Sequence, residues 1–331
     1  MSPARRSLLF ALIALALLAA LPFVIGNYWL RVLTSVFMVG VVAQGLNVIV
    51  GFAGYHAFGN SAFFGVGAYI VAVALNAGIP LPLAIVAAGA GSALVAGVFG
   101  WPLLRLRGHY FAIASVALNM AFIEVILNLG GITGGAQGLP LPISPMAPDL
   151  LYRIIYFIML GALVAATAVV WMLSQSRLGY ALRALKDSES GAEVMGVDTV
   201  RAKIAAWAIS AAMTGTVGGI WAYWITFIEV SSAFDIGISM RAYIMMLLGG
   251  IGTVFGPIAG AFLFQIVATL IWAEFTHIHN LLLGVFLVAV VLLVPHGVLP
   301  LLSRAGRRAA AARLFGASSR LSNRLFAREE R

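Results

Sequence analysis

The chain has 331 residues, of which 62% are apolar and only 9% are charged, and its mean hydropathy is +1.04. This composition excludes a water-soluble fold, because a soluble domain needs more polar surface to cover its apolar side chains. The sequence has no cysteine, which excludes disulfides, thiolate metal sites and thiol catalysis. The formal net charge of +9 by itself suggests a nucleic-acid partner, but the distribution of the charge along the chain argues against one.

Ten apolar runs follow one another along the chain, most of them near the length of about 20 residues that a membrane-crossing helix needs. They cover residues 8–26, 31–50, 60–76, 81–104, 109–128, 152–174, 203–228, 238–250, 255–273 and 280–298. The first run exceeds a typical signal-peptide core and no clear cleavage site follows it, so we expect an uncleaved first span. The run at 238–250 is too short to cross alone, which predicts a half-helix or part of a broken span. The pattern predicts an all-α, polytopic membrane protein with a transmembrane domain over residues 1–300.

Positive charge falls mainly on one side of this topology. With the N-terminus inside, 17 of the 20 lysines and arginines lie in cytoplasmic segments. They are Arg5, Arg6, Arg105, Arg107, Arg177, Arg183, Lys186, Arg201, Lys203 and the eight arginines from Arg304 to Arg331. This is the positive-inside pattern, so we expect both termini in the cytoplasm. The basic tail over residues 301–331 interleaves arginine with Leu and Phe, which predicts contact with membrane lipid rather than with nucleic acid.

Two glycine-rich stretches interrupt the apolar runs, GFAGYHAFGNSAFFG at residues 51–65 and GGIGTVFGPIAGAF at residues 249–262. Irregular backbone at membrane depth persists only where other helices or a water-filled cavity satisfy its polar groups, so these stretches indicate a nearby path through the protein. Small residues also let helix backbones approach closely. Each glycine therefore serves either gating or permanent tight packing. The candidates are Gly51, Gly54, Gly59, Gly65, Gly249, Gly250, Gly252 and Gly256.

Polar side chains within the predicted spans are candidates for a translocation pathway. They are Gln44, Asn47, Asn60, Ser61, Asn119, Glu124 and Gln265. We expect Glu124, in an otherwise apolar run, to face the bundle interior. There it either meets the ammonium group of a solute or pairs with an arginine near a helix end, Arg153 or Arg241. The amides at 44, 47 and 60 have the alternative role of hydrogen bonding between packed helices.

The longest polar segment between runs, SRLGYALRALKDSESGAEVMGVD at residues 176–198, has the pattern of a short amphipathic helix. Leu178, Leu182 and Leu185 share one face at helical spacing, and Gly196 is a natural stop. Such a helix either docks into a groove of a partner protein or rests on the membrane surface.

Five blocks of the sequence resemble a known family. They are GLNVIVGFAGYHAFGNSAFFGVGAY (45–69), LRLRGHYFAIA (104–114), TGGAQGL (133–139), SRLGYALRALKDSESGAEVMGV (176–197) and LLGGIGTVFGPIAGA (247–261). In this order they look like the branched-chain amino acid ABC transporter permeases of the LIV type, and among these the larger of the two permease subunits. The resemblance implies a bacterial inner-membrane importer subunit. It would pair with a second, related permease, two cytoplasmic ATPase subunits and a periplasmic solute-binding protein.

The resemblance also implies a role for the polar loop as the segment that couples to an ATPase subunit. The family pattern E-x-A-A-x-x-x-G matches Glu189, Ala192 and Gly196, with Gly191 in place of the first alanine. Arg183 and Lys186 belong to the same predicted coupling loop. The chain has no GxxxxGK[ST] phosphate loop, so we expect no cofactor in this chain and ATP hydrolysis by partner subunits.

Several positions depart from the family and leave the solute open. Relatives often carry His where this chain has Asn60 and Glu where it has Arg241, and many carry a Glu and an Arg at the places of Met120 and Ile123. The expected solute is a branched-chain or related amino acid, with another small polar solute such as urea, an amide or an aromatic acid as the alternative. The TGGAQGL block, expected outside, either contacts the solute or its binding protein or is an ordinary loop.

Two other classes of membrane protein remain as alternatives. An ion-coupled secondary transporter would share the broken helices, but it needs intramembrane acidic residues and Glu124 is the one strong candidate. A membrane-embedded enzyme has little support, because the chain has no HExxH, GxSxG or paired-carboxylate motif. We therefore expect no catalytic residue and no metal site.

Overall fold

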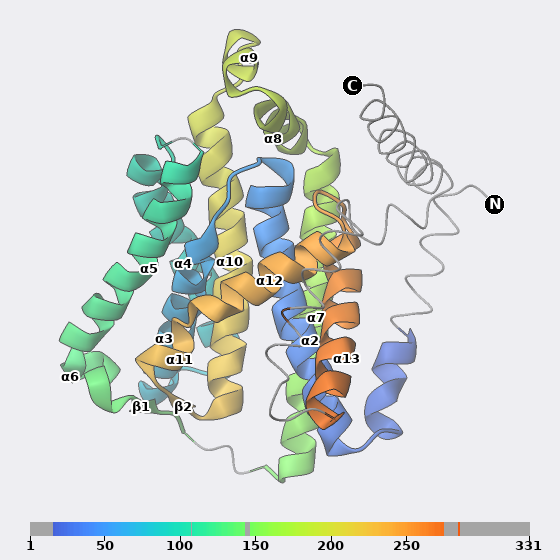
Figure 1. The fold of residues 1–331 in the computed structure, drawn as a ribbon. Coiled ribbons are helices and arrows are strands. Elements are labelled where there is room, and N and C mark those ends of the chain that lie inside the picture. Colours follow the sequence, from blue (N-terminus) through green and yellow to red (C-terminus); the bar gives the residue numbers. More distant parts are fainter. Residues whose placement is uncertain (1–15, 107, 143–145, 275–283, 285–331) are drawn as a thin grey trace, which may run out of the picture.

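The computed structural model describes residues 16–106, 108–142, 146–274 and 284, and this part of the chain is almost entirely helical (Figure 1). Six helical stretches in it are long and apolar enough to cross a membrane. They are α2 (Asn27–Leu46) continued by the π-helical η2 (Asn47–Phe52), η3 (Phe58–Asn60) continued by α3 (Ser61–Asn76), α4 (Leu81–Leu103), α5 (His109–Asn128), α7 (Pro148–Gln175) and α10 (Thr199–Ile225). Each coincides with a predicted run to within a few residues, which confirms the all-α fold.

Shorter elements complete the described fold. α12 (Ile236–Gly249) has 14 residues and is too short to cross alone, as predicted, and α13 (Gly256–Glu274) follows it. The others are η1 (Leu21–Phe23), α6 (Gly130–Thr133), η4 (Gly135–Gln137), β1 (Leu139–Pro140), α8 (Arg177–Asp187), α9 (Glu189–Val194), β2 (Phe227–Ile228) and α11 (Val230–Ala233). The predicted span 8–26 is described from residue 16 onward, where residues 16–20 are helical and η1 follows. The predicted span 280–298, apart from residue 284, and the tail 301–331 lie outside the described residues, so the total of ten spans stays a prediction.

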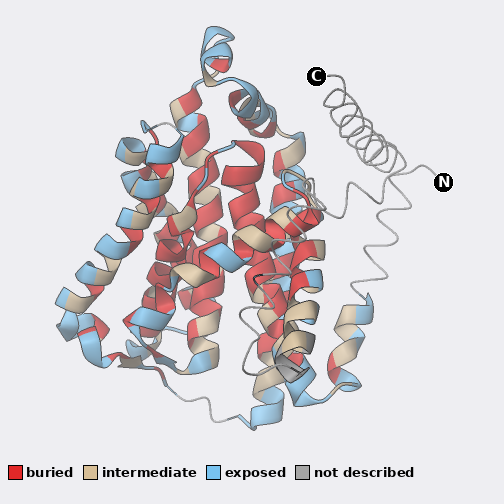
Figure 2. Cartoon of the chain, viewed as in Figure 1, coloured by how far each residue is buried: buried red, intermediate tan, exposed pale blue. Residues whose placement is uncertain are grey.

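α10 runs through the centre of the bundle and packs against α3 and α4, while α2 lies beside α7, α10, α12 and α13 (Figure 1). Glycines set the spacing between α3 and α10. A Cβ atom on Gly218 would lie 2.1 Å from the Phe64 carbonyl oxygen, and one on Gly67 would lie 2.0 Å from that of Gly215. The buried core is centred on α2, α3 and α10, and α4, α5 and α7 turn apolar faces outward (Figure 2).

The two ends of the bundle differ in structure. α8 and α9 project at one end, which we call the α8–α9 pole, and β1 and β2 lie at the other end, the β pole (Figure 1). β1 pairs antiparallel with β2, with Leu139 opposite Ile228. The TGGAQGL block thus folds as the last residue of α6, η4 and the start of β1, and it is held against the segment that follows α10.

Both glycine-rich stretches interrupt helices, as the sequence predicts. After η2 the chain is non-helical over residues 53–57, where Gly54 has a φ of 76°, and α3 begins at Ser61. After α12 the chain turns through Gly250 and Gly252, whose φ values are 123° and 75°. Glycine adopts positive φ at little steric cost, so these residue types suit the backbone that they form.

Candidate functional site

The predicted amphipathic loop folds as α8 and α9 at the α8–α9 pole. Ser176 and Ser188 cap these helices by accepting hydrogen bonds from the backbone N–H groups of Gly179 and Gly191. Leu182 is fully buried against the bundle, which confirms the amphipathic pattern. The expectation of one helix is wrong, because Ser188 takes an extended backbone and starts a second helix.

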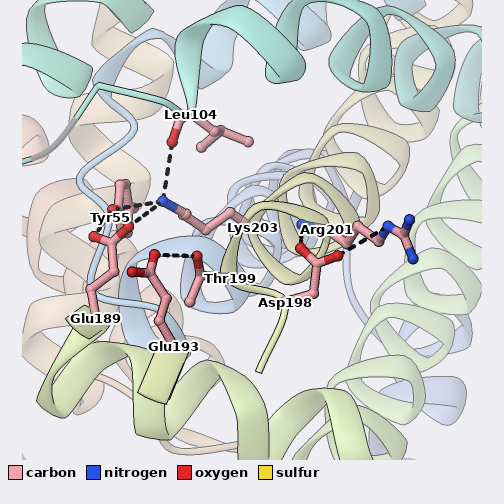
Figure 3. Close-up of polar contacts among 8 residues, drawn as sticks. All are labelled: Tyr55, Leu104, Glu189, Glu193, Asp198, Thr199, Arg201 and Lys203. Atoms are coloured by element: carbon pink, nitrogen blue, oxygen red, sulfur yellow. Dashed lines mark hydrogen bonds and ion pairs between the residues drawn. The ribbon is translucent and has the colours of Figure 1, made fainter. Parts of the chain in front are cut away.

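Lys203 lies one turn inside α10, and only 2% of its side chain is exposed. Its ammonium group donates to Glu189 Oε1 at 2.7 Å, to the Tyr55 hydroxyl at 3.1 Å and to the Leu104 carbonyl at 3.1 Å (Figure 3). The Tyr55 hydroxyl in turn donates to Glu189 Oε2 at 2.6 Å. All three N–H donors of the ammonium group are therefore used, as a buried charge requires.

We call Tyr55, Leu104, Glu189 and Lys203 the Lys203 cluster. It joins four parts of the chain, namely the segment after η2, the end of α4, the start of α9 and the first turns of α10 (Figure 3). The sequence analysis counted Lys203 only as a topological charge and missed this role. The available signal was the run IAAWAI directly after Lys203, which places the lysine within an apolar helix rather than before it.

Two further predicted coupling residues point toward the bundle. Lys186 donates to the Gly51 carbonyl at 2.8 Å. Arg183 donates to the Ser174 carbonyl, and its guanidinium group lies 5.5 Å from the ring centroid of Phe52. Because Gly51 and Phe52 end η2, these contacts attach α8 to the first glycine-rich stretch.

The remaining two predicted coupling residues differ in position: Ala192 is on the inner side of the loop, and Gly196 is exposed. Ala192 is 3% exposed, and Gly196, with a φ of 84°, turns the chain from α9 toward α10. The large side chains at the tip are Val194 and Met195, which are 87% and 84% exposed. The loop thus presents an apolar tip that the sequence motif did not identify.

Asn47 joins the two glycine-rich stretches. Its amide group donates to the Thr253 carbonyl at 2.8 Å, and its side-chain oxygen accepts from the Gly252 N–H at 2.8 Å. A Cβ atom on Gly51 would lie 2.9 Å from the same Gly252 nitrogen. The two stretches, about 200 residues apart in sequence, therefore pack directly against each other beside α8.

Other candidate glycines also lie in close contacts. A Cβ atom added to Gly59 would lie 1.7 Å from the Ser115 carbonyl oxygen, and one added to Gly65 would lie 2.5 Å from the Phe234 ring. One added to Gly249 would lie 1.7 Å from the Gly256 carbonyl oxygen. These distances support the packing role. A gating role for any of them stays a prediction.

Three of the predicted pathway amides are buried and hydrogen-bonded inside the bundle. Asn60 donates to the Thr214 hydroxyl at 2.8 Å and Asn119 donates to the Phe234 carbonyl at 3.0 Å. Gln44 donates to the chain between α12 and α13 at 2.7 Å. In this conformation these groups act as hydrogen bonds between packed elements, which is the alternative given above for Gln44 and Asn60.

The expectation that Glu124 faces the bundle interior is wrong, because its side chain is exposed on the outward face of α5. The buried positions of α5 are Phe111, Ser115, Leu118, Asn119 and Ile126. Five residues separate Glu124 from position 119, which is about 140° around a helix. Neither proposed arginine partner reaches it: Arg241 pairs with Asp235 at 3.3 Å, and Arg153 lies over the ring of Phe23.

A cavity of about 600 Å³ opens at the β-pole ends of α2, α7 and α10. Its lining includes Arg31, Tyr28, Tyr152, Trp221, Trp224 and, of the predicted pathway residues, Gln265. Within the described ranges, no group of three or more His, Asp or Glu side chains is placed to hold a metal ion.

The six spans define a multi-pass membrane protein whose projecting loop is tied to the ends of its membrane helices. Residues 28–291 match the family described as branched-chain amino acid transport system, permease component, and the chain belongs to this family. The resemblance of the five sequence blocks is thereby confirmed.

Relatives within the family differ in name and in similarity. The chain is 29% identical over 325 residues to the high-affinity branched-chain amino acid transport system permease protein LivM of Salmonella typhimurium, which covers 88% of this chain and 75% of LivM. It is 25% identical over 284 residues to LivH of Escherichia coli K12, covering 78% and 90%. It is 30% identical over 224 residues to the autoinducer 2 import system permease protein LsrC of Salmonella paratyphi B, covering 62% and 60%. No solved structure matches.

The chain is therefore an ABC transport permease and not an enzyme. Its greater similarity to LivM than to LivH agrees with the expectation of the larger LIV-type permease.

Proposed function

We propose that this chain forms part of the translocation pathway of an ATP-driven importer for branched-chain or related amino acids. Its partners in this proposal are a second homologous permease, two cytoplasmic ATPase subunits and a periplasmic binding protein that delivers the solute. The α8–α9 pole and both termini face the cytoplasm of a bacterial cell, as the distribution of lysine and arginine indicates.

One observation carries this proposal: the loop of α8 and α9 projects from the bundle and is fixed to it on its inner side. Lys186 and Glu189 bind the bundle, while Val194 and Met195 are exposed at the tip. An apolar tip on a firmly held short helix suits insertion into a groove of a partner subunit. The buried face of α8 is covered by the chain itself, which favours docking over a helix that rests on lipid.

The tip supports a direct test. Val194→Asp and Met195→Asp should weaken binding of the ATPase subunits about 30-fold, because a central apolar contact contributes about 2 kcal/mol or more. The measurement is co-purification of the ATPase subunits with the permease, together with solute uptake in cells that express the whole complex. Ile79→Asp is the matched control, since Ile79 is 42% exposed but lies between α3 and α4 near the β pole.

Full co-purification and uptake by both tip variants would contradict docking through α9. The variants should still insert, because Val194 and Met195 contribute little to the buried core. Membrane content of the chain, measured by immunoblot, separates lost docking from lost insertion.

The proposed solute covers a wider class of compounds than branched-chain amino acids alone. The relative LsrC is named for import of autoinducer 2, so membership in the family does not restrict the cargo to amino acids. Amides, urea and aromatic acids remain the alternatives to a branched-chain amino acid. A thermal-shift screen of the binding protein encoded beside this gene, followed by uptake of each hit, tests the assignment. A screen that yields no amino acid among its ligands would contradict it.

The outward Glu124 supports a path that runs along α5, between this chain and the second permease. Glu124 lies one turn before the β-pole end of α5, where a carboxylate against lipid costs less than at the bilayer centre, about 2.5–3.5 kcal/mol, but is still unfavourable. Its exposed side chain therefore favours a wet or protein-covered surface. In this proposal the chain supplies one wall of the pathway, which agrees with the internal hydrogen bonds of Asn60 and Asn119.

A further inference from the structure

We propose that Lys203 is a positioning residue that fixes α9 to the membrane bundle and so transmits the movement of α9 to the first glycine-rich stretch. The inference rests on the proposed function of α8 and α9 as the ATPase-coupling loop. It assigns the transmitting contact to a lysine outside the loop motif.

The arrangement of acceptors carries the first step. The Lys203 ammonium group is buried and binds one oxygen from each of three other parts of the chain, Glu189, Tyr55 and Leu104. A single charge that satisfies three acceptors fixes their relative positions more firmly than separate neutral contacts do, because charge-assisted hydrogen bonds are short and strong. A displacement of α9 must therefore move these partners or break the cluster.

The shortness of α9 carries the second step. This helix has six residues, and an isolated helix of that length is not stable in water. Its position depends on contacts with the rest of the protein, and Glu189 in its first turn makes an ion pair at 2.7 Å with the buried Lys203. At its other end, the Thr199 hydroxyl donates to Glu193 at 3.0 Å (Figure 3). Both ends of α9 are thus held by α10.

The third step concerns a row of aromatic side chains that leads from the Lys203 cluster into the bundle. The Tyr55 ring lies 5.5 Å from the Phe111 ring, Phe111 lies 5.4 Å from Trp207, and Trp207 lies 5.2 Å from Phe63, all measured between ring centroids. Edge-to-face aromatic contacts of this kind are packed and directional. They connect the Lys203 cluster to α5, α10 and the first turn of α3, the helix that begins after the irregular segment.

The first experiment measures the position of α9 in the full chain and requires no transport. Because the sequence has no cysteine, Met195→Cys and Val98→Cys introduce the only two sites for spin labels. Met195 is exposed at the end of α9, and Val98 is exposed on α4. Pulsed electron paramagnetic resonance gives their distance distribution in lipid nanodiscs. We expect one narrow distribution in the parent chain and a broadened one after Lys203→Met, which keeps the length of the side chain and removes its donors.

A second variant and a control keep the result interpretable if Lys203→Met folds poorly. Tyr55→Phe removes one hydroxyl and keeps the ring on Phe111, so the chain should fold and show a smaller broadening. Arg201→Gln removes a cation two residues from Lys203 whose ion pair with Asp198 is at the surface, and it should leave the distribution unchanged.

The second experiment measures leucine uptake per ATP hydrolysed by the assembled complex in proteoliposomes. Lys203→Met should lower this ratio about tenfold, the effect of losing about 1.4 kcal/mol of coupling. A merely structural defect lowers the amount of complex and reduces both rates together, which leaves the ratio unchanged.

An unchanged distance distribution after Lys203→Met overturns the proposal, and so does an unchanged ratio when the distribution broadens. If the parent complex takes up neither leucine nor any hit of the ligand screen, the proposed function fails. The distance measurement still decides whether Lys203 positions α9.

Discussion

Asn47 shows how one side chain can hold irregular backbone within a membrane protein. Its amide satisfies the Thr253 carbonyl and its oxygen satisfies the Gly252 N–H, both in the turn between α12 and α13. A backbone group buried without such a partner costs about 1–3 kcal/mol. The side chain thus replaces the helical hydrogen bonds that the turn has lost.

We expect Asn47→Ala to lower the free energy of unfolding by about 1–3 kcal/mol, because it leaves two partly buried backbone groups without partners. Thermal unfolding of the detergent-solubilised chain, followed by tryptophan fluorescence, measures the effect. Asn128→Ala is the matched control, since the Asn128 amide is exposed and donates to the Glu124 carbonyl of its own helix. Equal melting temperatures for the two variants would contradict the role of Asn47.

His56, in the non-helical segment after η2, predicts a pH dependence of stability. Burial lowers its pKa below the ordinary value of 6.5, and the nearby charges of His109 and Lys186 lower it further, against a backbone hydrogen bond with Gly54 that raises it. The unfolded chain therefore binds more protons than the folded chain as the pH falls below about 6.5. The folded state is stabilised fully above that pH and loses this contribution as the pH falls toward the lowered pKa.

His56→Gln should reduce the difference in melting temperature between about pH 7.5 and about pH 5.5, because glutamine does not titrate in this range. His109→Gln should keep most of the difference, since burial is the larger cause of the shift at His56. A pH dependence that is the same in the parent and in His56→Gln would refute this assignment.

At the scale of elements, the close contact between α3 and α10 depends on glycines that leave room for the neighbouring backbone. Gly218→Ala would place a methyl group 2.1 Å from the Phe64 carbonyl oxygen and force the two helices apart. We expect a loss of about 1–3 kcal/mol in the free energy of unfolding, as for other overpacked cores. Gly97→Ala on α4 should have little effect, because nothing lies within 4 Å of the added atom. Thermal unfolding in detergent compares the two, and equal losses would rule out the close contact.

The extent of each span was predictable because it reflects the thickness of the bilayer. The run at 81–104 is α4 at Leu81–Leu103, and the run at 109–128 is α5 itself. The buried face of a span was less predictable. α5 is apolar on all sides apart from a few residues, so hydrophobic periodicity does not report which side meets protein, and Glu124 was assigned to the wrong face.

The site was predictable only where its signal is local. The caps and the buried leucines of α8 follow from nearby residues, and the glycine-rich stretches indicate irregular backbone directly. Burial of Lys203 depends instead on Tyr55 and Leu104, which lie 148 and 99 residues away in sequence. A lysine near the end of a span ordinarily indicates only the topology of the chain. Motifs and charge counts do not predict contacts between residues this far apart in sequence.

For the whole molecule, the outward face of α5 leads to a test of the pathway. Glu124→Gln should lower amino acid uptake about tenfold, the effect of losing about 1.4 kcal/mol of a charge-assisted contact with a solute ammonium group. Glu229→Gln is the control, because Glu229 is exposed next to β2, outside the spans. Uptake is measured in cells with equal membrane content of each variant. Unchanged uptake of every candidate solute after Glu124→Gln would remove Glu124 from the pathway.

The Lys203 cluster has a consequence for biosynthesis. All three acceptors of Lys203, at Tyr55, Leu104 and Glu189, precede it in the sequence. A chain made from its N-terminus has thus synthesised every partner of this ammonium group before the lysine itself. The ammonium group can therefore pair as α10 enters the membrane, where an uncompensated charge would be costly. A circular permutation that placed α10 ahead of these partners would remove this order, although it would leave the final contacts unchanged.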